Sequence, residues 1–238
     1  MDPLNLKKVN AARRKRQAVI LLTDLGDGRD RVVLEGDTVA GELGEAIGRA
    51  FLSGKSGTVE IGGRQMFLNV HVPPPRIVAI GAVHITQALA QIARVSGFDL
   101  EIIDPRTAFA TAERFEGVRL FAEWPDAVLK DRPLDRYTAL AAVTHDPKID
   151  DFPLAEALRN KCFYVGALGS RKTHAKRVER LVALGIESGD IGKIAAPIGL
   201  DIGASSPAEI AVAIMAQIIG AFRRRGLQGE AEDGAGAA

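Results

Sequence analysis

The residues most able to do chemistry follow short apolar runs in the second part of the sequence. They combine glycines that permit tight turns with histidine, hydroxyl, carboxylate and guanidinium side chains. In chain order they are Gly81, His84, Asp104, Arg106, Thr144, His145, Asp146, Gly166, Gly169, Ser170, Arg171 and, in a later glycine-rich loop, Asp201. Parallel strands end at one edge of an open α/β sheet, and ligands bind beyond that edge. These residues therefore predict a binding site for a nucleotide-like, phosphate-bearing ligand.

The first glycine corner lies in the stretch RIVAIGAVHITQAL, residues 76–89. Gly81 permits a sharp turn, and the helix expected after it offers backbone N–H groups to a phosphate. Asp104 follows 23 residues later, close to the spacing at which a carboxylate binds a ribose hydroxyl. Val83 stands where the dinucleotide fingerprint has its second glycine. The corner therefore fits a dinucleotide, a different nucleotide-like ligand, or close packing of strand and helix.

The second glycine corner is GALGSRKTHAKR, residues 166–177. It places Ser170 as a helix cap, with four cations at or near the first helical turns: Arg171, Lys172, Lys176 and Arg177. The helix dipole disfavours cations there unless an anion binds, so the pattern predicts an anion cradle. The alternative is a solvated basic helix face.

Other polar residues have a structural and a functional interpretation. His145 and Asp146 fit a metal-ligand pair, an acid/base pair, or groups that orient a ligand and cap a loop. Asp201 fits a bond to a ligand hydroxyl or amine, or an Asx turn in its own loop. Cys162 is the only cysteine, and its apolar surroundings predict a buried strand residue. Because no metal motif or nucleophile–base pair is recognisable, the sequence predicts no metal ligand and no catalytic residue.

The elements that must position these residues alternate between strand and helix. Apolar runs predict strands at 76–81, 98–104, 118–122, 137–145 and 162–168. A helix from Ser170 is expected to bury Ala175, Val178, Leu181 and Val182. A last helix has Ser206 and Glu209 as a capping box and ends in the arginines at 223–225. This alternation predicts a Rossmann-like α/β domain, a parallel sheet with helices on both faces.

A smaller unit precedes this domain. Strands at 18–22 and 31–36, a helix ending near Gly54 and a hairpin turning at Gly62-Gly63 predict an α+β domain over residues 1–72. The prolines at 73–75 mark its boundary. The ligand-binding domain is expected over 73–226, followed by a disordered tail over 227–238.

Charge and hydropathy exclude several classes of partner. Lys and Arg number 31 against 30 for Asp and Glu, so nucleic acid is not an expected partner. The basic run at 13–16 is interpreted as a solvated segment before the first strand. No apolar stretch is long enough for a membrane span, and the N-terminus lacks a signal-peptide apolar region. A cytoplasmic location is therefore expected.

Several longer strings together resemble the xanthine dehydrogenase accessory factor family, of the XdhC/CoxI type. They are GAVHITQALAQIARVSGFDLEIIDPRTAFATAERF, VTHDPKIDD, YVGALGSRKTHAKRVERL and APIGLDIGASSPAEIAVAIMAQII, which span about residues 76–222 in order. Many full-length family members carry a proline-arginine motif and a cysteine in a glycine-rich turn of the N-terminal unit. Here VAGELGEAIGRA resembles only a remnant of that turn, and Cys162 lies elsewhere.

The resemblance implies a function as well as a fold. It implies a chaperone that binds molybdenum cofactor, as the molybdopterin or its dinucleotide form, and passes it to a molybdenum hydroxylase apoenzyme of the xanthine or CO dehydrogenase type. The cofactor would be protected there while its sulfido ligand is installed. A cysteine desulfurase is a further partner that the resemblance implies, and a homodimer is expected.

Two alternatives remain open on the residues alone. An NAD(P)-dependent oxidoreductase would use Gly81 and Asp104, with Asp104 favouring NAD and Arg106 able to meet the 2′-phosphate of NADP. An interaction subunit of a maturation complex would use the apolar helix 207–222 as a dimer surface, although its apolar stripe is more typical of a core helix.

Overall fold

The structure is a computed structural model that describes the backbone of residues 2–233 and the side chains up to residue 225. It divides into two compact units. The first comprises Met1–Pro73 and the chain from Arg224 onward, and the second comprises Pro74–Arg223. The division in the linker falls within the run of three prolines.

The first unit is built on a four-stranded antiparallel sheet of order β2-β1-β4-β3. Its elements are α1 (Pro3–Arg14), β1 (Val19–Asp24), β2 (Asp30–Leu34), α2 (Gly41–Ser53), β3 (Gly57–Ile61) and β4 (Arg64–His71). Both hairpins have glycines of positive φ in their turns, at Gly28 and at Gly62-Gly63, and α2 ends at Gly54 in the left-handed conformation. The hairpins and α2 predicted from the sequence are therefore confirmed.

The helix α1 was not predicted from the sequence. Its last turn contains Arg13 and Arg14, which are exposed, as expected for a solvated basic segment before the first strand. Val9 and Ala12 are buried against Val19 and Leu21 of β1. Two apolar residues one turn apart give too weak a periodic signal, so packing against the sheet decides this helix.

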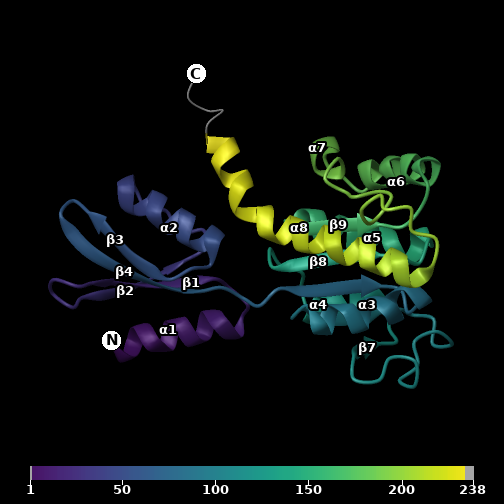
Figure 1. The fold of residues 1–238 in the computed structure, drawn as a ribbon, viewed down its shortest axis with the longest axis horizontal. Coiled ribbons are helices and arrows are strands. Elements are labelled where there is room, and N and C mark those ends of the chain that lie inside the picture. The colour runs from purple at the N-terminus through teal and green to yellow at the C-terminus, as the bar shows by residue number, and fades with distance from the viewer. Residues whose placement is uncertain (1, 234–238) are drawn as a thin grey trace. The chain divides into compact units, whose positions relative to one another are not determined.

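The second unit contains a five-stranded parallel sheet of order β7-β6-β5-β8-β9, which confirms the Rossmann-like prediction (Figure 1). Its elements are β5 (Arg76–Ile80), α3 (His84–Val95), β6 (Asp99–Ile103), β7 (Arg119–Phe121), α4 (Pro125–Asp131), β8 (Thr138–Ala142), α5 (Pro147–Arg159), β9 (Tyr164–Ala167), α6 (Arg171–Ala183), α7 (Ser188–Ile191) and α8 (Pro207–Asp233), the last of which continues into the first unit. Cys162 precedes β9 rather than lying in the strand, and it is half-buried.

Alternate residues of the strands pack on two layers of helices. Val78 and Ile80 of β5 face a core that includes residues of α4, α5, α6 and α7. Ile77 of the same strand faces a core formed with α3 and α8. The apolar β5 and β8 are fully buried because helices cover both faces of the sheet.

The last helix begins as predicted and extends further than predicted. Ser206 Oγ accepts a hydrogen bond from the N–H of Glu209, and the Glu209 carboxylate accepts from the N–H of Ser206. Ile214 and Ile218 are fully buried, so this part of α8 is a core helix. The helix continues to Asp233, through part of the segment 227–238 expected to be disordered. Residues 234–238 of that segment lie outside the described part of the chain.

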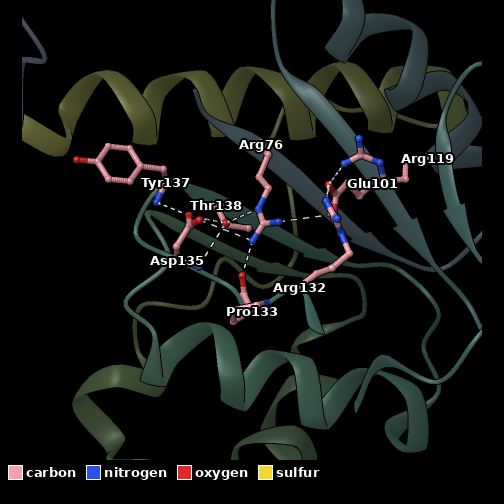
Figure 2. Close-up of polar contacts among 8 residues, drawn as sticks. All are labelled: Arg76, Glu101, Arg119, Arg132, Pro133, Asp135, Tyr137 and Thr138. Carbon is pink, nitrogen blue, oxygen red and sulfur yellow. Dashed lines mark hydrogen bonds and ion pairs between the residues drawn. The ribbon is translucent and has the colours of Figure 1, made fainter. Parts of the chain in front are cut away.

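A network of charged side chains lies towards the amino ends of the strands, with the buried Arg76 and Glu101 at its centre (Figure 2). Arg76 Nε donates to Thr138 Oγ1 at 3.0 Å, and its guanidinium lies 3.6 Å from the Glu101 carboxylate. Arg119 and Arg132 donate to Glu101 at 2.6 and 2.5 Å. This network joins β5, β6, β7 and β8 at the edge opposite the predicted ligand site.

Candidate functional site at the carboxyl edge of the sheet

Most of the predicted site residues follow the carboxyl ends of β5, β6, β8 and β9, whereas Gly166 lies within β9 and Asp201 in the loop before α8. The sheet order places β5 between β6 and β8, so the chain adds strands on one side of β5 and then on the other. Open α/β sheets bind ligands at this switch point because the loops diverge there. Loops from both halves of the domain are therefore brought to one edge.

Gly81 lies where the loops after β5 and β8 come closest. Its φ is +122°, and a Cβ at this position would lie only 2.8 Å from Thr144 Cγ2. The Gly81 N–H donates to the Ile103 carbonyl at 2.9 Å, and Thr86 Oγ1 donates to the Gly81 carbonyl at 2.6 Å. Glycine is therefore needed here for the close approach of the segment after β8, whereas the packing role considered from the sequence was between the strand and the following helix.

Asp104 is fully buried and binds its own protein on both oxygens. The Ala82 N–H donates to Oδ2 at 2.7 Å, and Arg106 donates from Nε to Oδ1 and from Nη2 to Oδ2. Burial works to raise the pKa of Asp104, but the bonds from Arg106 and Ala82 hold it below its ordinary value. The carboxylate thus closes the first glycine corner. The ribose bond expected from the spacing would have to displace one of these contacts.

The loop after β8 connects the first corner to α5. Thr144 Oγ1 accepts a hydrogen bond from the Asp146 N–H at 3.0 Å and donates to Asp150 Oδ1 at 2.7 Å. The Asp146 carboxylate accepts from the Lys148 N–H at 2.9 Å and caps α5. His145, between them, is exposed and has a φ of +67°, a conformation that costs energy outside glycine and tends to mark functional sites.

A pocket of about 320 Å³ opens between this loop and α6. We call it the α5–α6 pocket. It is lined by His145 and Pro147 before and at the start of α5, by Asp150 and Asp151 in α5, and by Lys172, Thr173, Lys176, Arg177 and Arg180 in α6. Four cationic side chains therefore line it against two carboxylates.

The most buried members of this pocket are oppositely charged and incompletely bonded. Arg177 is 2% exposed and donates from Nη2 to the Leu168 carbonyl at 2.9 Å, but Nε and Nη1 find no acceptor among the described residues. Asp150 is 1% exposed, and its Oδ2 likewise has no hydrogen-bond partner in the described part of the chain. An unsatisfied buried polar group costs roughly 1–3 kcal/mol, and more when it is charged. A polar ligand at this position would offset that cost.

The pKa values reflect this environment. Burial raises the pKa of Asp150 to about 6, against the opposing effects of the Thr144 hydroxyl and the Arg177 charge. Burial also lowers the pKa of Arg177, which the charges of Asp150 and Asp151 partly offset. Strongly perturbed groups in a pocket are typical of functional sites.

Arg180 and Asp151 both line the pocket and pair with each other, which leaves the other cations of the pocket available to a ligand. Arg180 Nη2 donates to Asp151 Oδ1 at 3.0 Å, and Nε makes a second, short contact with Oδ2. Lys172 and Lys176 are exposed at the rim, above the buried Arg177. With Arg180 and Asp151 paired, three cations face one carboxylate, so the pocket favours an anion.

The second glycine corner begins the helix that carries these cations. Gly169 has a φ of +135°, and Ser170 Oγ accepts from the Thr173 N–H at 3.2 Å, which confirms the predicted cap. Gly166 lies within β9, where a Cβ would come within 2.6 Å of both Tyr164 Oη and Ile198 Cγ1, so its role is in packing. Arg171 is exposed and does not line the α5–α6 pocket.

Two further predicted residues also lie outside the α5–α6 pocket. His84 is exposed at the start of α3, with Nδ1 3.0 Å from Gln87 Oε1. Asp201 is exposed in the loop before α8. Arg106 lies nearer to the α5–α6 pocket. The charges of Asp146 and Asp150, together with the contacts to Asp104, raise the pKa of Arg106.

The sequence placed Arg177 among the four cations of a predicted anion cradle but did not predict that it is buried. Asp150, which is equally buried, was not included among the predicted site residues. The predicted buried face of α6 was partly wrong, since Ala175 and Val182 are exposed while Arg177 and Leu181 are buried. The available signal was spacing, because Arg177 precedes Leu181 by four residues and therefore shares its face of the helix.

Similarity to known proteins covers the same region. The XdhC Rossmann domain family matches residues 77–218, which include every residue lining the α5–α6 pocket. The chain is 30% identical over 165 residues to a Bacillus subtilis strain 168 protein described as a probable xanthine dehydrogenase subunit, covering 67% of this chain and 46% of that protein. It is 29% identical over 147 residues to the molybdenum cofactor insertion chaperone PaoD of Escherichia coli K12, covering 61% of this chain and 40% of PaoD.

A solved structure supports the fold. A Bacillus halodurans protein described as a xanthine dehydrogenase aligns with a TM-score of 0.60 and 22% identity, covering 93% of this chain and 65% of that one. The chain spans less than half the length of either curated relative.

In the described part of the chain, no cluster of three or more His, Cys, Asp or Glu is placed to hold a metal ion, and no helix is long and apolar enough to cross a membrane.

Proposed function

Because the chain belongs to the XdhC family, we propose that it is an accessory factor that binds molybdenum cofactor and delivers it to a molybdenum hydroxylase of the xanthine or CO dehydrogenase type. The family match and the relatives named for xanthine dehydrogenase and for molybdenum cofactor insertion support an accessory role. Binding and delivery by this chain are the parts that require a test.

The observation that carries the proposal is the incompletely bonded guanidinium of Arg177 in the α5–α6 pocket. Molybdenum cofactor reaches its client as a pterin that bears a phosphate or a nucleotide, so an anion-binding pocket at the carboxyl edge suits its charged part. Lys172 and Lys176 at the rim provide further charge. We assign the cofactor as cargo, with this chain binding it and not turning it over.

We do not propose a nicotinamide dinucleotide as the ligand. Such a ligand uses the N–H groups of the first glycine corner and a free carboxylate after the second strand. Here the Ala82 N–H and Asp104 bind one another, and Arg106 occupies the remaining positions of the carboxylate. The geometry therefore gives the oxidoreductase alternative no specific support.

Anaerobic titration of the full chain with molybdenum cofactor tests binding. The molybdenum that elutes with the protein after gel filtration is measured for the wild type, Arg177→Met and Arg171→Met. We expect stoichiometric molybdenum with the wild type and Arg171→Met, and at least a tenfold loss with Arg177→Met. Lys176→Met, a change at an exposed position, keeps the test valid if Arg177→Met fails to fold. Equal retention by all the variants would place the cargo elsewhere.

Delivery needs a separate measurement. The loaded protein is mixed with a xanthine dehydrogenase type apoenzyme, and the recovery of hydroxylase activity is compared with that given by free cofactor. We expect faster recovery with the loaded protein.

A parallel titration with NADH should leave its absorbance and fluorescence unchanged, whereas saturable binding of NADH would favour the oxidoreductase. Co-elution with a cysteine desulfurase tests the further partner, and sedimentation velocity tests the homodimer.

A further inference from the structure

An acidic side chain at the centre of a cationic pocket is unexpected for a simple anion site. Asp150 is as deeply buried as Arg177, and its Oδ2 has no hydrogen-bond partner among the described residues. An ionised carboxylate there would repel a bound anion. A protonated carboxyl would instead donate a hydrogen bond to that anion, as the N–H groups of Arg177 would.

We propose that the α5–α6 pocket binds the terminal phosphate of a phosphate monoester, and that Asp150 takes up one proton when the phosphate binds. The proton comes from solvent, lies between a carboxyl oxygen of Asp150 and a phosphate oxygen in the complex, and returns to solvent on release. The identification of the monoester with the pterin phosphate of the cargo rests on the proposed function. The phosphate site itself does not.

The position and size of the pocket favour a terminal phosphate over a bridging diphosphate. A bridging diphosphate normally lies on the first glycine corner, where Asp104 already binds the Ala82 N–H. The pocket volume of about 320 Å³ is near the lower end of the range for small-molecule sites. Because the rim lysines are exposed and Arg177 lies below them, a group at the end of a ligand can reach Arg177 most directly.

The groups around Asp150 make its protonation sensitive to an anion. Burial raises the pKa of Asp150 to about 6, close enough to neutrality for a nearby negative charge to drive proton uptake. From the loop after β8, the Thr144 hydroxyl and the backbone amides of Thr144 and His145 face Asp150.

The other charges near Asp150 come from three elements. They are Arg177 and Arg180 of α6, Asp146 and Asp151 of α5 and its cap, and Arg106 in the loop after β6. The same pocket is also lined by the titratable His145 and by Lys172 and Lys176 at its rim. A bound phosphate would neutralise the field of Arg177, which otherwise favours the ionised carboxylate. Anion binding and protonation of Asp150 should therefore favour one another.

Calorimetric titration of the full chain with sulfate tests the proton coupling, since sulfate keeps the same charge between pH 5 and 9. For the wild type we expect the association constant to fall about tenfold per pH unit above pH 7, as required for the uptake of one proton. Asp150→Asn should bind sulfate with little dependence on pH, and at pH 8.5 more tightly than the wild type. The exposed Asp131→Asn serves as the matched control and should retain the slope of the wild type. A pH-independent wild type, or an Asp150→Asn variant that keeps the slope, would overturn the coupling.

Methyl phosphate and dimethyl phosphate at pH 6 test the ligand class. We expect the monoester to bind at least tenfold more tightly than the diester, and Arg177→Met to abolish binding of both sulfate and the monoester. Equal binding of the two esters would refute the assignment of a terminal phosphate. If sulfate and methyl phosphate bind as expected while molybdenum is not retained, the phosphate site stands and the proposed function fails. If molybdenum is retained but neither anion binds, the proposed function stands and the phosphate site fails.

Discussion

Asp150→Asn is expected to stabilise the second unit at pH 8, because the buried carboxyl of Asp150 opposes folding when it is ionised. Burial raises its pKa from the ordinary 3.8 to about 6. A carboxyl whose pKa is higher in the folded state destabilises that state above the folded pKa, and this effect disappears as pH falls towards the unfolded value. A difference of about two pKa units corresponds to about 3 kcal/mol. The gain at pH 8 should therefore approach that figure, which already includes the opposing attraction to Arg177.

The pH dependence of this gain separates it from a simple packing effect. The same linkage gives a gain of about 1.6 kcal/mol at pH 5 and of about 0.6 kcal/mol at pH 4. Urea unfolding followed by the fluorescence of Trp124 measures these values, because this residue is the only tryptophan and belongs to the second unit. Asparagine retains an oxygen that can accept the Thr144 hydroxyl, so the existing hydrogen bond need not be lost.

Asp131→Asn provides the control for this measurement. Asp131 is exposed at the end of α4, and its replacement should change the free energy of unfolding by less than about 0.5 kcal/mol at every pH. An Asp150→Asn variant that is no more stable than the wild type at pH 8 would refute the reasoning. A gain of constant size from pH 8 to pH 4 would refute it equally, since it could not come from ionisation.

Three further changes test the framework that holds the site. Glu101→Gln should cost roughly 3–5 kcal/mol at pH 7, because it removes a charged partner of the buried Arg76. Burial works to raise the pKa of Glu101, but Arg132, Arg76 and Arg119 hold it below 4.5. The loss of stability in Glu101→Gln should therefore shrink as pH falls below that value. A loss that stays constant with pH in the same fluorescence assay would contradict this. Gly81→Ala should cost roughly 1–3 kcal/mol through its positive φ and the approach to Thr144, and an unchanged calorimetric Tm would argue against that strain. Ser206→Ala should cost about 1 kcal/mol and speed hydrogen exchange in the first turn of α8, whereas unchanged exchange would mean that the Glu209 carboxylate suffices as a cap.

The fold of the second unit could be predicted because its signals are local. Each buried strand is an apolar run, and the helices begin with caps such as Ser170 and Ser206 that act on their own first turn. Alternation of such elements leaves few possible topologies, since parallel strands require right-handed crossovers. The helix α1 escaped prediction because its burial depends on β1, with which its two buried apolar residues pack.

The edge of the site could be predicted as well, since topology brings every strand end to it. Thr144 and His145 are at the α5–α6 pocket or bonded to it, as that logic requires. Asp104 was selected by its spacing and Gly166 by its place in a glycine corner, and the structure assigns both a role in holding the protein together. A residue type at a given spacing does not reveal whether its polar atoms are already bonded to the protein.

The sequence by itself determined the alternation of strands and helices in the second unit, the parallel sheet and the edge at which the predicted site residues gather, because these follow from short-range periodicity and capping. Tertiary structure alone decided which charged groups at that edge remain unsatisfied. Asp104 and Arg106 bond to each other, whereas Arg177 and Asp150 are buried with polar atoms left without partners. Burial and hydrogen-bond satisfaction depend on segments that are distant in the sequence, so only the folded chain separates a structural ion pair from a pocket that can bind an anion.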